Sequence, residues 1–283
     1  MENKTSLILE GGGMRGLYTA GVLDYFLEKG LEFNCLYGVS AGCLNAVSYL
    51  SKQKGRNLAT FTDYLHNKNH SGLGMFLKTG NFFNPEFLYD EIPNKLNLLD
   101  YDSFDNNPTE FYAVVSNVNT GKAEYVKCDT MDCSVEYIRA SASLPLISQI
   151  VKIDDKEYLD GGVCDSIPLR KSILDGNTKN VVILTQHKGF VKKPTKNLKL
   201  IKHVYKKYPL LYKALKYRHV MYNTQLEYTY DKQQKGQAFI IQPDLPLEVS
   251  RLEKNKYKLY NIYNIGYQQA KKMYPDIINY LNS

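Results

Sequence analysis

Ser40 stands at the centre of Gly38-Val39-Ser40-Ala41-Gly42, between an apolar run at 33–37 and a segment of helical spacing at 43–50. Glycines on both sides of a serine, here Gly38 and Gly42, allow a strand-to-helix turn sharp enough to lift the hydroxyl clear of the strand. At the start of the helix, the backbone N–H groups and the helix dipole favour a developing negative charge. The spacing predicts a nucleophilic serine, and the alternative is an ordinary turn of small residues.

A second glycine cluster, Gly11-Gly12-Gly13-Met14-Arg15-Gly16, follows the apolar run at 5–10. It lacks the G-K-[ST] ending of a phosphate loop, and it lacks the glycine spacing of a dinucleotide-binding loop with an acidic residue about 20 positions later. Consecutive glycine N–H groups at a helix N-terminus can instead stabilise an oxyanion, because the missing side chains let a carbonyl oxygen approach. The alternative is a turn that serves packing only.

A serine nucleophile needs a base to accept its proton. His187 follows an apolar strand-like run, where an α/β-hydrolase would place its histidine. The other histidines are in a polar stretch expected to be exposed (His66 and His70) or in a lysine-rich segment (His203 and His219). Asp160 is the preferred candidate, since it ends a strand-like run, precedes two glycines and could accept the hydroxyl proton directly. A single Asp-Gly-Gly is, however, more typical of a plain turn.

The elements that must position these residues alternate between strand and helix. Apolar runs at 5–10 and 33–37 predict buried strands, and the spacing at 17–27 predicts a helix ending near Gly30. This order predicts parallel β-α-β units and an α/β fold. Further along, we expect irregular helices over 56–99 that cap the site, strands at 110–117, 122–128, 149–153, 157–159, 180–185 and 237–242, and helices at 132–142, 167–174 and 253–273.

Together, Gly-Gly-Gly-Met-Arg-Gly at 11–16, Gly-Val-Ser-Ala-Gly at 38–42 and Asp-Gly-Gly at 160–162 resemble the patatin-like phospholipases. The resemblance covers roughly residues 5–186 and includes the stretches 140–145 and 163–168. It implies a three-layer α/β/α fold with a mainly parallel central sheet, in which Ser40 is the nucleophile and Asp160 its base, without a histidine. It also implies an oxyanion hole (Gly11, Gly12, Gly13, Arg15, Gly16 and Ala41), an elbow (Gly38 and Gly42) and a motif around the aspartate (Gly161 and Gly162).

The function implied by this resemblance is a serine lipid acyl hydrolase. It would cleave fatty-acyl esters of phospholipids or lysophospholipids through an acyl-Ser40 intermediate, with neither a metal nor a cofactor. Two alternatives stay open at this point. One is a general carboxylesterase or thioesterase that acts on soluble esters, and the other is a catalytically idle module that binds a membrane surface.

The amino-acid composition limits which class of protein this can be and in which compartment it is expected. A chain of 283 residues that is 43% hydrophobic can bury a sizeable core, and no run reaches the roughly 20 apolar residues of a membrane-spanning helix. Residues 1–4 include an acid and begin no apolar run, so we expect no secretory signal. The five cysteines are an odd number without a close-spaced framework. We therefore expect a cytoplasmic protein, with a peripheral contact to the inner face of the membrane.

The charge is concentrated in one segment. Residues 188–219 contain ten lysines, one arginine and no acid, although the net charge of the whole chain is only +7. We expect a catalytic core over 5–186 and a basic, mostly helical extension over 187–283 packed on it, with its helices broken at 208–209. The lysines could be a solvated helix face, or a surface for anionic lipid. Nucleic-acid binding is a third alternative, which no recognition motif accompanies. The lysines assigned to a membrane contact are Lys192, Lys193, Lys199, Lys202, Lys206, Lys207, Lys213 and Lys216.

Overall fold

The chain alternates strands and helices, and the computed structural model describes residues 4–250 and 252–283. The first three residues, part of the segment in which we expect no secretory signal, lie outside the described residues. The strands are β1 (Thr5–Leu9), β2 (Cys35–Val39), β3 (Glu110–Asn117), β4 (Lys122–Lys127), β5 (Val151–Ile153), β6 (Lys156–Asp160), β7 (Lys179–Ile183) and β8 (Ala238–Ile241).

The helices are of three kinds. The α-helices are α1 (Gly16–Glu28), α2 (Ala41–Leu50), α3 (Arg56–Thr62), α4 (Leu73–Thr79), α5 (Tyr101–Asp105), α6 (Met131–Ser141), α7 (Leu169–Leu174), α8 (Leu198–Val204), α9 (Pro209–Gln234) and α10 (Lys256–Asn282). Two short 3-10 helices, η1 (Gly13–Arg15) and η3 (Gly161–Val163), lie in the glycine loop and in the Asp-Gly-Gly motif. A π-helix, η2 (Phe87–Leu96), completes the set.

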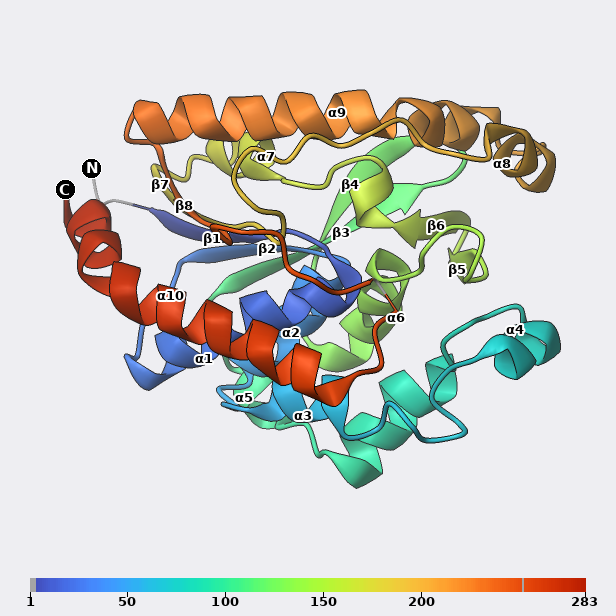
Figure 1. Cartoon of the computed structure of the whole chain (residues 1–283), viewed down its shortest axis with the longest axis horizontal. Coiled ribbons are helices and arrows are strands. Elements are labelled where there is room, and N and C mark those ends of the chain that lie inside the picture. Colours follow the sequence, from blue (N-terminus) through green and yellow to red (C-terminus); the bar gives the residue numbers. More distant parts are fainter. Residues whose placement is uncertain (1–3, 251) are drawn as a thin grey trace.

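One sheet separates two layers of helices (Figure 1). Its strand order is β5-β6-β3-β2-β1-β7-β8, and β4 pairs with β3 in addition. The pairs among β3, β2, β1, β7 and β8 are parallel, whereas β4, β5 and β6 join through antiparallel pairs. The layers contain α1, α2 and α10 on one face, with α7 and α9 on the other. The predicted three-layer α/β/α fold with a mainly parallel sheet is confirmed.

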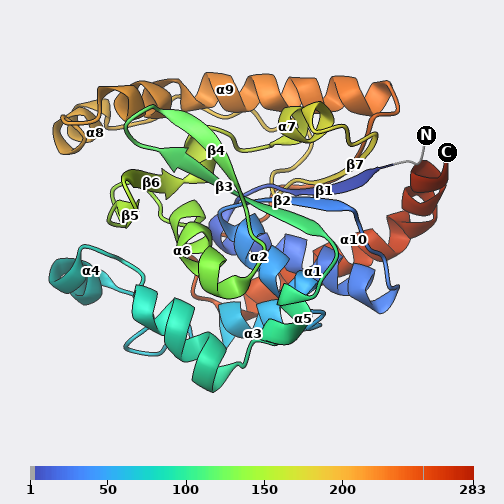
Figure 2. The same ribbon diagram turned by 180° about the vertical axis from the view of Figure 1, so that it is seen from behind.

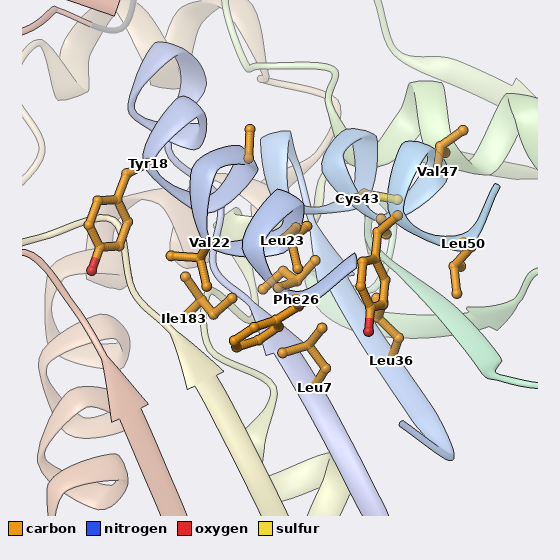
Figure 3. Close-up of a cluster of buried hydrophobic side chains, with 14 of the residues drawn as sticks. Leu7, Tyr18, Val22, Leu23, Phe26, Leu36, Cys43, Val47, Leu50 and Ile183 are labelled. Carbon is orange, nitrogen blue, oxygen red and sulfur yellow. The ribbon is translucent and has the colours of Figure 1, made fainter. Parts of the chain in front are cut away.

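The central strands are apolar because both of their faces are covered. Successive side chains of a strand point to opposite faces, so Leu7 and Leu9 pack in the layer of α1 and α2, while Ile8 packs in the layer of α9. Figure 3 shows Val22, Leu23 and Phe26 of α1 directed toward Leu7, Leu36 and Ile183 of the sheet. These contacts fix α1 and α2 above the carboxyl ends of β1 and β2, where the two glycine motifs lie.

The strand β3 brings two distant parts of the chain together. Its first half pairs with β2, ending at Val39 opposite Val114, and its second half pairs with β6, starting at Val115 opposite Asp160. Because β4 occupies the other edge of β3, β2 and β6 lie on the same edge, one after the other. β2 runs parallel to β3 and β6 antiparallel to it, so the carboxyl ends of β2 and β6 meet.

Helix α10 packs against α1 almost backbone to backbone, and Figure 2 shows the two crossing on one side of the sheet. A Cβ atom added to Gly21 would lie 2.0 Å from the carbonyl oxygen of Tyr263. A Cβ atom on Gly266 would lie 2.0 Å from the carbonyl oxygen of Tyr18. Only glycine permits so close an approach, so this pair of glycines sets the distance between the helices.

The C-terminal part of the chain contributes to the sheet as well as to the helix layers. β8 pairs in parallel with β7 along Asn180 to Ile183. α10 is longer than the helix expected over 253–273 and continues past Pro275 to Asn282, because Ile277 is buried and the Tyr280 hydroxyl accepts from Asn180 N–H at 2.8 Å. The division of the chain at residue 186 stays a prediction. No helix among the described residues carries an apolar stretch long enough to cross a bilayer.

The close crossing of α1 and α10 leads to a stability prediction. Gly266→Ala places a methyl group against the Tyr18 carbonyl oxygen and should lower the free energy of unfolding by at least about 2 kcal/mol. Gly74→Ala is the matched control, since Gly74 is also helical and a Cβ there meets no atom within 4 Å. Urea unfolding of the two variants measures the difference, and equal midpoints would contradict the packing described.

Candidate active site

Ser40 connects β2 to α2 in a strained conformation. Its backbone angles are φ 55° and ψ −122°, outside the regions that a serine ordinarily adopts, which costs about 1–3 kcal/mol. Gly38 and Gly42 allow the turn to pack tightly: added Cβ atoms would lie 2.7 Å from Cα of Cys43 and 2.4 Å from the Leu9 carbonyl oxygen. The strain turns the hydroxyl away from the strand and over the N-terminus of α2, as the elbow motif predicts.

The structure brings the Ser40 hydroxyl and the Asp160 carboxylate together. Ser40 Oγ donates to Asp160 Oδ2 at 2.5 Å, and both residues are buried. The backbone N–H of Ser40 donates to Ser141 Oγ at 2.9 Å, which fixes the elbow from the side of α6. A short hydrogen bond to a carboxylate is the geometry from which a hydroxyl can transfer its proton as it attacks.

Asp160 is held in place through both its side chain and its backbone. Its second carboxylate oxygen, Oδ1, accepts from Gly162 N–H at 2.8 Å. Its own N–H donates to the Ser143 carbonyl oxygen at 2.8 Å, and its carbonyl accepts from Ser116 Oγ at 2.8 Å. Gly161 packs so closely on β3 that an added Cβ would lie 2.0 Å from the Val114 carbonyl oxygen. The carboxylate therefore has a fixed direction toward Ser40.

The buried carboxylate of Glu10 anchors the start of the glycine loop. Glu10 Oε2 accepts from Thr185 N–H at 2.6 Å, and Glu10 Oε1 accepts from the Tyr222 hydroxyl at 2.8 Å. Thr185 Oγ1 also donates to the Gly11 carbonyl oxygen at 2.9 Å. Burial, together with the Glu10 carboxylate, raises the pKa of Tyr222 far above its usual range, so the phenol stays a donor. The loop is thereby tied to β7 and to α9.

The residues assigned to the oxyanion hole take different positions around Ser40. Gly13 and Ala41 line the cavity described below, together with Met14. A Cβ on Gly11 would lie 2.8 Å from Ser40 Cβ, so this glycine leaves room for the nucleophile itself. Of the others, Gly12 packs on Thr185, Gly16 packs on Ala41, and the positive charge of Arg15 acts on Tyr222. The assignment of the oxyanion hole stays a prediction.

An apolar cavity of about 250 Å³ begins at Ser40. Its walls come from α2, α3, η2 and α6, so the irregular helices expected over 56–99 do cover the site. The apolar lining side chains are Leu44, Val47, Phe61, Phe83, Leu88, Ile92, Leu99, Met131, Val135 and Ile138. A nucleophile at the base of such a cavity suits a substrate with an extended hydrocarbon part.

His70 is a correction to the sequence analysis, which expected it in an exposed stretch. It is 6% exposed and lines the cavity, with its ring set edge-on against Phe83 and Phe87. Burial lowers the pKa of His70 to about 4, and the positive charge of Lys254 adds to this effect. The ring is therefore neutral at physiological pH. The polar sequence around it gave no signal, because aromatic side chains of the following loop cover it.

His187 follows β7 as expected, but its ring is half-buried against Phe190 and does not line the cavity. Its Nδ1 atom is 2.8 Å from the Lys188 carbonyl oxygen. Within the described parts of the chain, His70 is the histidine that lines the cavity, and Ser40 Oγ has the Asp160 carboxylate as its partner. The geometry thus favours aspartate over histidine as the base.

Arg218 of α9 is a site residue that the sequence analysis counted only as part of the basic segment. Its Nε–H donates to the Gly162 carbonyl oxygen at 2.5 Å. A Cβ built on Gly162 would lie 3.1 Å from both an Arg218 guanidinium nitrogen and Asp160 Oδ1, so the cation is close to the carboxylate. The sequence hardly distinguishes Arg218, since it is one arginine in a segment that also contains ten lysines.

Metal-binding side chains are not grouped in the described residues: no cluster of three or more His, Cys, Asp or Glu side chains is close enough to hold an ion. The cysteines at 35, 43, 128, 133 and 164 are all unpaired thiols. Burial raises the pKa of the Cys128 and Cys164 thiols to about 11. These thiols are accordingly protonated, in keeping with small packing residues.

Comparisons with known proteins match two parts of the chain. Residues 7–172 match the patatin-like phospholipase family, and residues 208–282 match a domain of unknown function, DUF6363. An uncharacterized protein of Escherichia coli K12, YjjU, is 29% identical over 196 residues, which are 64% of this chain and 52% of YjjU. A probable lipid hydrolase of Invertebrate iridescent virus 6, 463L, is 25% identical over 191 residues, 62% of this chain and 65% of 463L.

The chain therefore spans less than two thirds of the length of either relative. Among solved structures, VipD from Legionella pneumophila aligns over 96% of this chain and 67% of its own, at a TM-score of 0.46 and 11% sequence identity.

Arg218 should act as a positioning residue for Asp160. Arg218→Ala should lower kcat on a short soluble ester by about 10- to 100-fold with little change in KM, because the Gly162 carbonyl oxygen keeps only the Ser166 hydroxyl as a donor and the cation beside Asp160 is removed. The acid limb of the pH–rate profile should also move to higher pH, since a nearby cation favours an ionised carboxylate. Lys216→Ala removes an exposed charge from the same helix and is the control. An unchanged profile in Arg218→Ala would refute this role.

His70 should make stability depend on pH. The unfolded chain takes up a proton near pH 6.5, whereas the folded ring does so only near pH 4. The stability contributed by the neutral ring is thus present above pH 6.5 and is lost as the pH falls toward 4. Between pH 7 and 4.5, the free energy of unfolding should fall by about 2–3 kcal/mol less in His70→Gln than in the parent. The exposed His66→Gln is the control, and identical pH dependence in all three proteins would contradict the prediction.

Proposed function

The chain belongs to the patatin-like phospholipase family, and on this premise we propose that it hydrolyses fatty-acyl esters of phospholipids or lysophospholipids. The observation that carries the proposal is the 2.5 Å hydrogen bond from Ser40 Oγ to Asp160 Oδ2 at the base of an apolar cavity. The similarity to 463L, a probable lipid hydrolase, supports this substrate class. The reaction is an acyl transfer through Ser40.

In the first half of the reaction, Ser40 Oγ attacks the ester carbonyl carbon while Asp160 accepts the hydroxyl proton. The tetrahedral intermediate then expels the alcohol oxygen, which takes that proton, and an acyl-Ser40 ester is left. In the second half, Asp160 accepts a proton from water as the water attacks the acyl carbon. Breakdown of this intermediate returns the proton to Ser40 Oγ and releases the fatty acid.

The charge that develops on the carbonyl oxygen needs donors beside Ser40. The first N–H groups of α2, beginning with Ala41, have no partner inside the helix and face the same region as its positive dipole end. Gly13 and Met14 of the glycine loop also line the cavity, next to Ser40 and Ala41 in the lining. Each such donor contributes on the order of 10²–10³ in rate in hydrolases that use an oxyanion hole.

The lining of the cavity favours a fatty-acyl ester over a small soluble ester. Most of the wall is aliphatic or aromatic, and polar side chains such as Arg56, Asn57 and Arg139 make up the smaller part of it. A general carboxylesterase or thioesterase would show little dependence on acyl length. For the proposed function, kcat/KM should rise with acyl length, because each buried methylene adds about 0.8 kcal/mol of transfer free energy.

Loss of either dyad member should abolish turnover. Ser40→Ala and Asp160→Asn should each lower kcat at least about a thousandfold on mixed phospholipids and on a short ester, with products followed by mass spectrometry. A fluorophosphonate probe should label Ser40 in the parent and should not label Ser40→Ala. If the protein were a catalytically idle binding module, the parent would not be labelled either. Retained esterase activity in Asp160→Asn would refute the dyad.

The histidine variants separate a dyad from a triad. His187→Ala, which removes the histidine expected for an α/β-hydrolase, should leave kcat within about twofold of the parent. His70→Ala changes the wall of the cavity, so its effect should appear in KM for long acyl chains and not on a short ester. A thousandfold loss in His187→Ala would replace the dyad by a triad.

A further inference from the structure

The loop 144–149, which follows α6, forms the rim of the cavity. Gln149 lines the cavity and is exposed, so it marks where the cavity opens to solvent. On one side, this loop is tied to the segment after α4: Gln149 Nε2 donates to the Thr79 carbonyl oxygen at 2.8 Å, and Phe82 N–H donates to the Ile147 carbonyl oxygen at 2.8 Å. On the other side, Leu146 N–H donates to the Tyr205 hydroxyl at the end of α8 at 2.8 Å. The opening therefore lies between α4 and α8.

Both helices project from the same side of the molecule. Figures 1 and 2 show α4 and α8 at one end, with β5 and β6 between them, and the chain termini at the opposite end. Their contacts to the rim loop agree with this arrangement. A flat partner that touched both helices would cover the opening.

Helix α4 exposes apolar side chains at its tip. Leu73 is 69% exposed and Leu77 is 78% exposed, and none of the residues of α4 is buried. A single exposed leucine is common on the surface of a monomeric protein. In α4, however, two leucines are exposed on one short helix that buries none of its residues, so packing within the protein does not account for them. Its apolar side chains are available to a partner.

Helix α8 repeats the pattern on the other side. Ile201 and Tyr205 are buried against the body of the protein, while Leu200 and Val204 remain 51% and 49% exposed. At the start of α9, Leu210 is 48% exposed. The helix thus has apolar residues on its inward face and also on the face that looks away from the protein.

The same end of the protein is strongly basic. The exposed lysines next to α8, on α8 and at the start of α9 are Lys196, Lys199, Lys202, Lys206, Lys207, Lys213 and Lys216, with Lys78 on α4. No acidic residue occurs between 188 and 219, and the exposed acids between α4 and α8 are Asp154 and Asp155 in the turn from β5 to β6, so the lysines outnumber them. Lys192 differs, because its ammonium group packs 4.0 Å from the ring centroid of Tyr222 and is half-buried. Apolar side chains interleaved with lysines match an anionic lipid surface, in which phosphates lie above hydrocarbon.

We propose that α4, α8 and the start of α9 dock the protein on an anionic bilayer, with Leu73, Leu77, Leu200 and Val204 inserted among the lipids. The lysines of α8 and α9 bind the lipid phosphates, and the rim at Gln149 faces the membrane. A lipid then enters the cavity without crossing bulk water. The orientation rests on the proposed lipid substrate, whereas the docking itself requires no catalysis. Nucleic acid offers no apolar layer for the leucines.

The experiment measures binding in a Ser40→Ala background, so that vesicles are not degraded. Co-sedimentation compares neutral phosphatidylcholine vesicles with vesicles that also contain phosphatidylglycerol. Binding should be at least about tenfold tighter to the anionic vesicles and should weaken as salt is raised through the physiological range. Equal binding to both vesicles, or retention of a labelled oligonucleotide with no vesicle binding, would overturn the proposal.

Variants locate the surface. Leu73→Ser with Leu77→Ser, and separately Leu200→Ser with Val204→Ser, should each weaken binding about tenfold or more. Leu174→Ser is the control, since Leu174 is 77% exposed but ends α7, which packs on the sheet and does not line the cavity. Lys199→Glu with Lys202→Glu should weaken binding similarly, unlike Lys271→Glu with Lys272→Glu on α10. Unchanged binding in both leucine variants would refute the assignment.

A second measurement keeps docking apart from chemistry. With Ser40 intact, the leucine and lysine variants should hydrolyse a short soluble ester at the parent rate while losing activity on anionic vesicles. Loss of both activities together would show that α4 and α8 serve the fold and not a docking surface. If the parent hydrolyses no ester at all, the proposed function fails, and vesicle binding by Ser40→Ala still decides the docking.

Discussion

The hydrogen bond between Ser40 and Asp160 depends on the register of a single strand. β3 holds the end of β2 at Val114 and the end of β6 at Val115, on one edge, so two carboxyl termini that are far apart in sequence meet head to head. A slip of one residue in either pairing would turn every side chain of that strand to the other face of the sheet. Phe111, Ala113, Val114 and Val115 of β3 are buried in the core, which opposes such a slip and thereby fixes the positions of Ser40 and Asp160.

Helix α9 supports this arrangement from behind. Tyr222 holds Glu10 under the glycine loop, and Arg218, one turn earlier, holds Gly162 beside Asp160. One helix therefore braces both the glycine loop and the Asp-Gly-Gly motif. This helix begins the region matched by a domain of unknown function, and the three glycine-containing motifs all lie in the region matched by the patatin-like family. The two regions form one site.

The sequence predicts the parts of the site that depend on local backbone geometry. An elbow glycine such as Gly42 and the Asp-Gly-Gly turn can be predicted because few residue types fit these backbone positions. The sheet can be predicted because apolar runs alternate along the chain with segments of helical spacing. Contacts between segments that are far apart in the chain produce no such local pattern in the sequence. The burial of His70 depends on Phe83 and Phe87 folding over it, and Arg218 is recognised only when α9 is placed beside Gly162. Ser141 lies within a stretch that resembles the family, yet its bond to the Ser40 backbone appears only in three dimensions.

The glycine-to-glycine crossing of α1 and α10 also bears on how the chain is made. Gly21 and Gly266, which form this crossing, are separated by most of the chain. Helix α1 therefore leaves the ribosome long before α10, which covers it, has been synthesised. At typical elongation rates of roughly 5–20 residues per second, the apolar face of α1 waits on the order of ten seconds or more. During that time it is a surface of the kind that chaperones bind. The crossing that gives the finished protein its tightest helix contact is thus the one that forms last during synthesis.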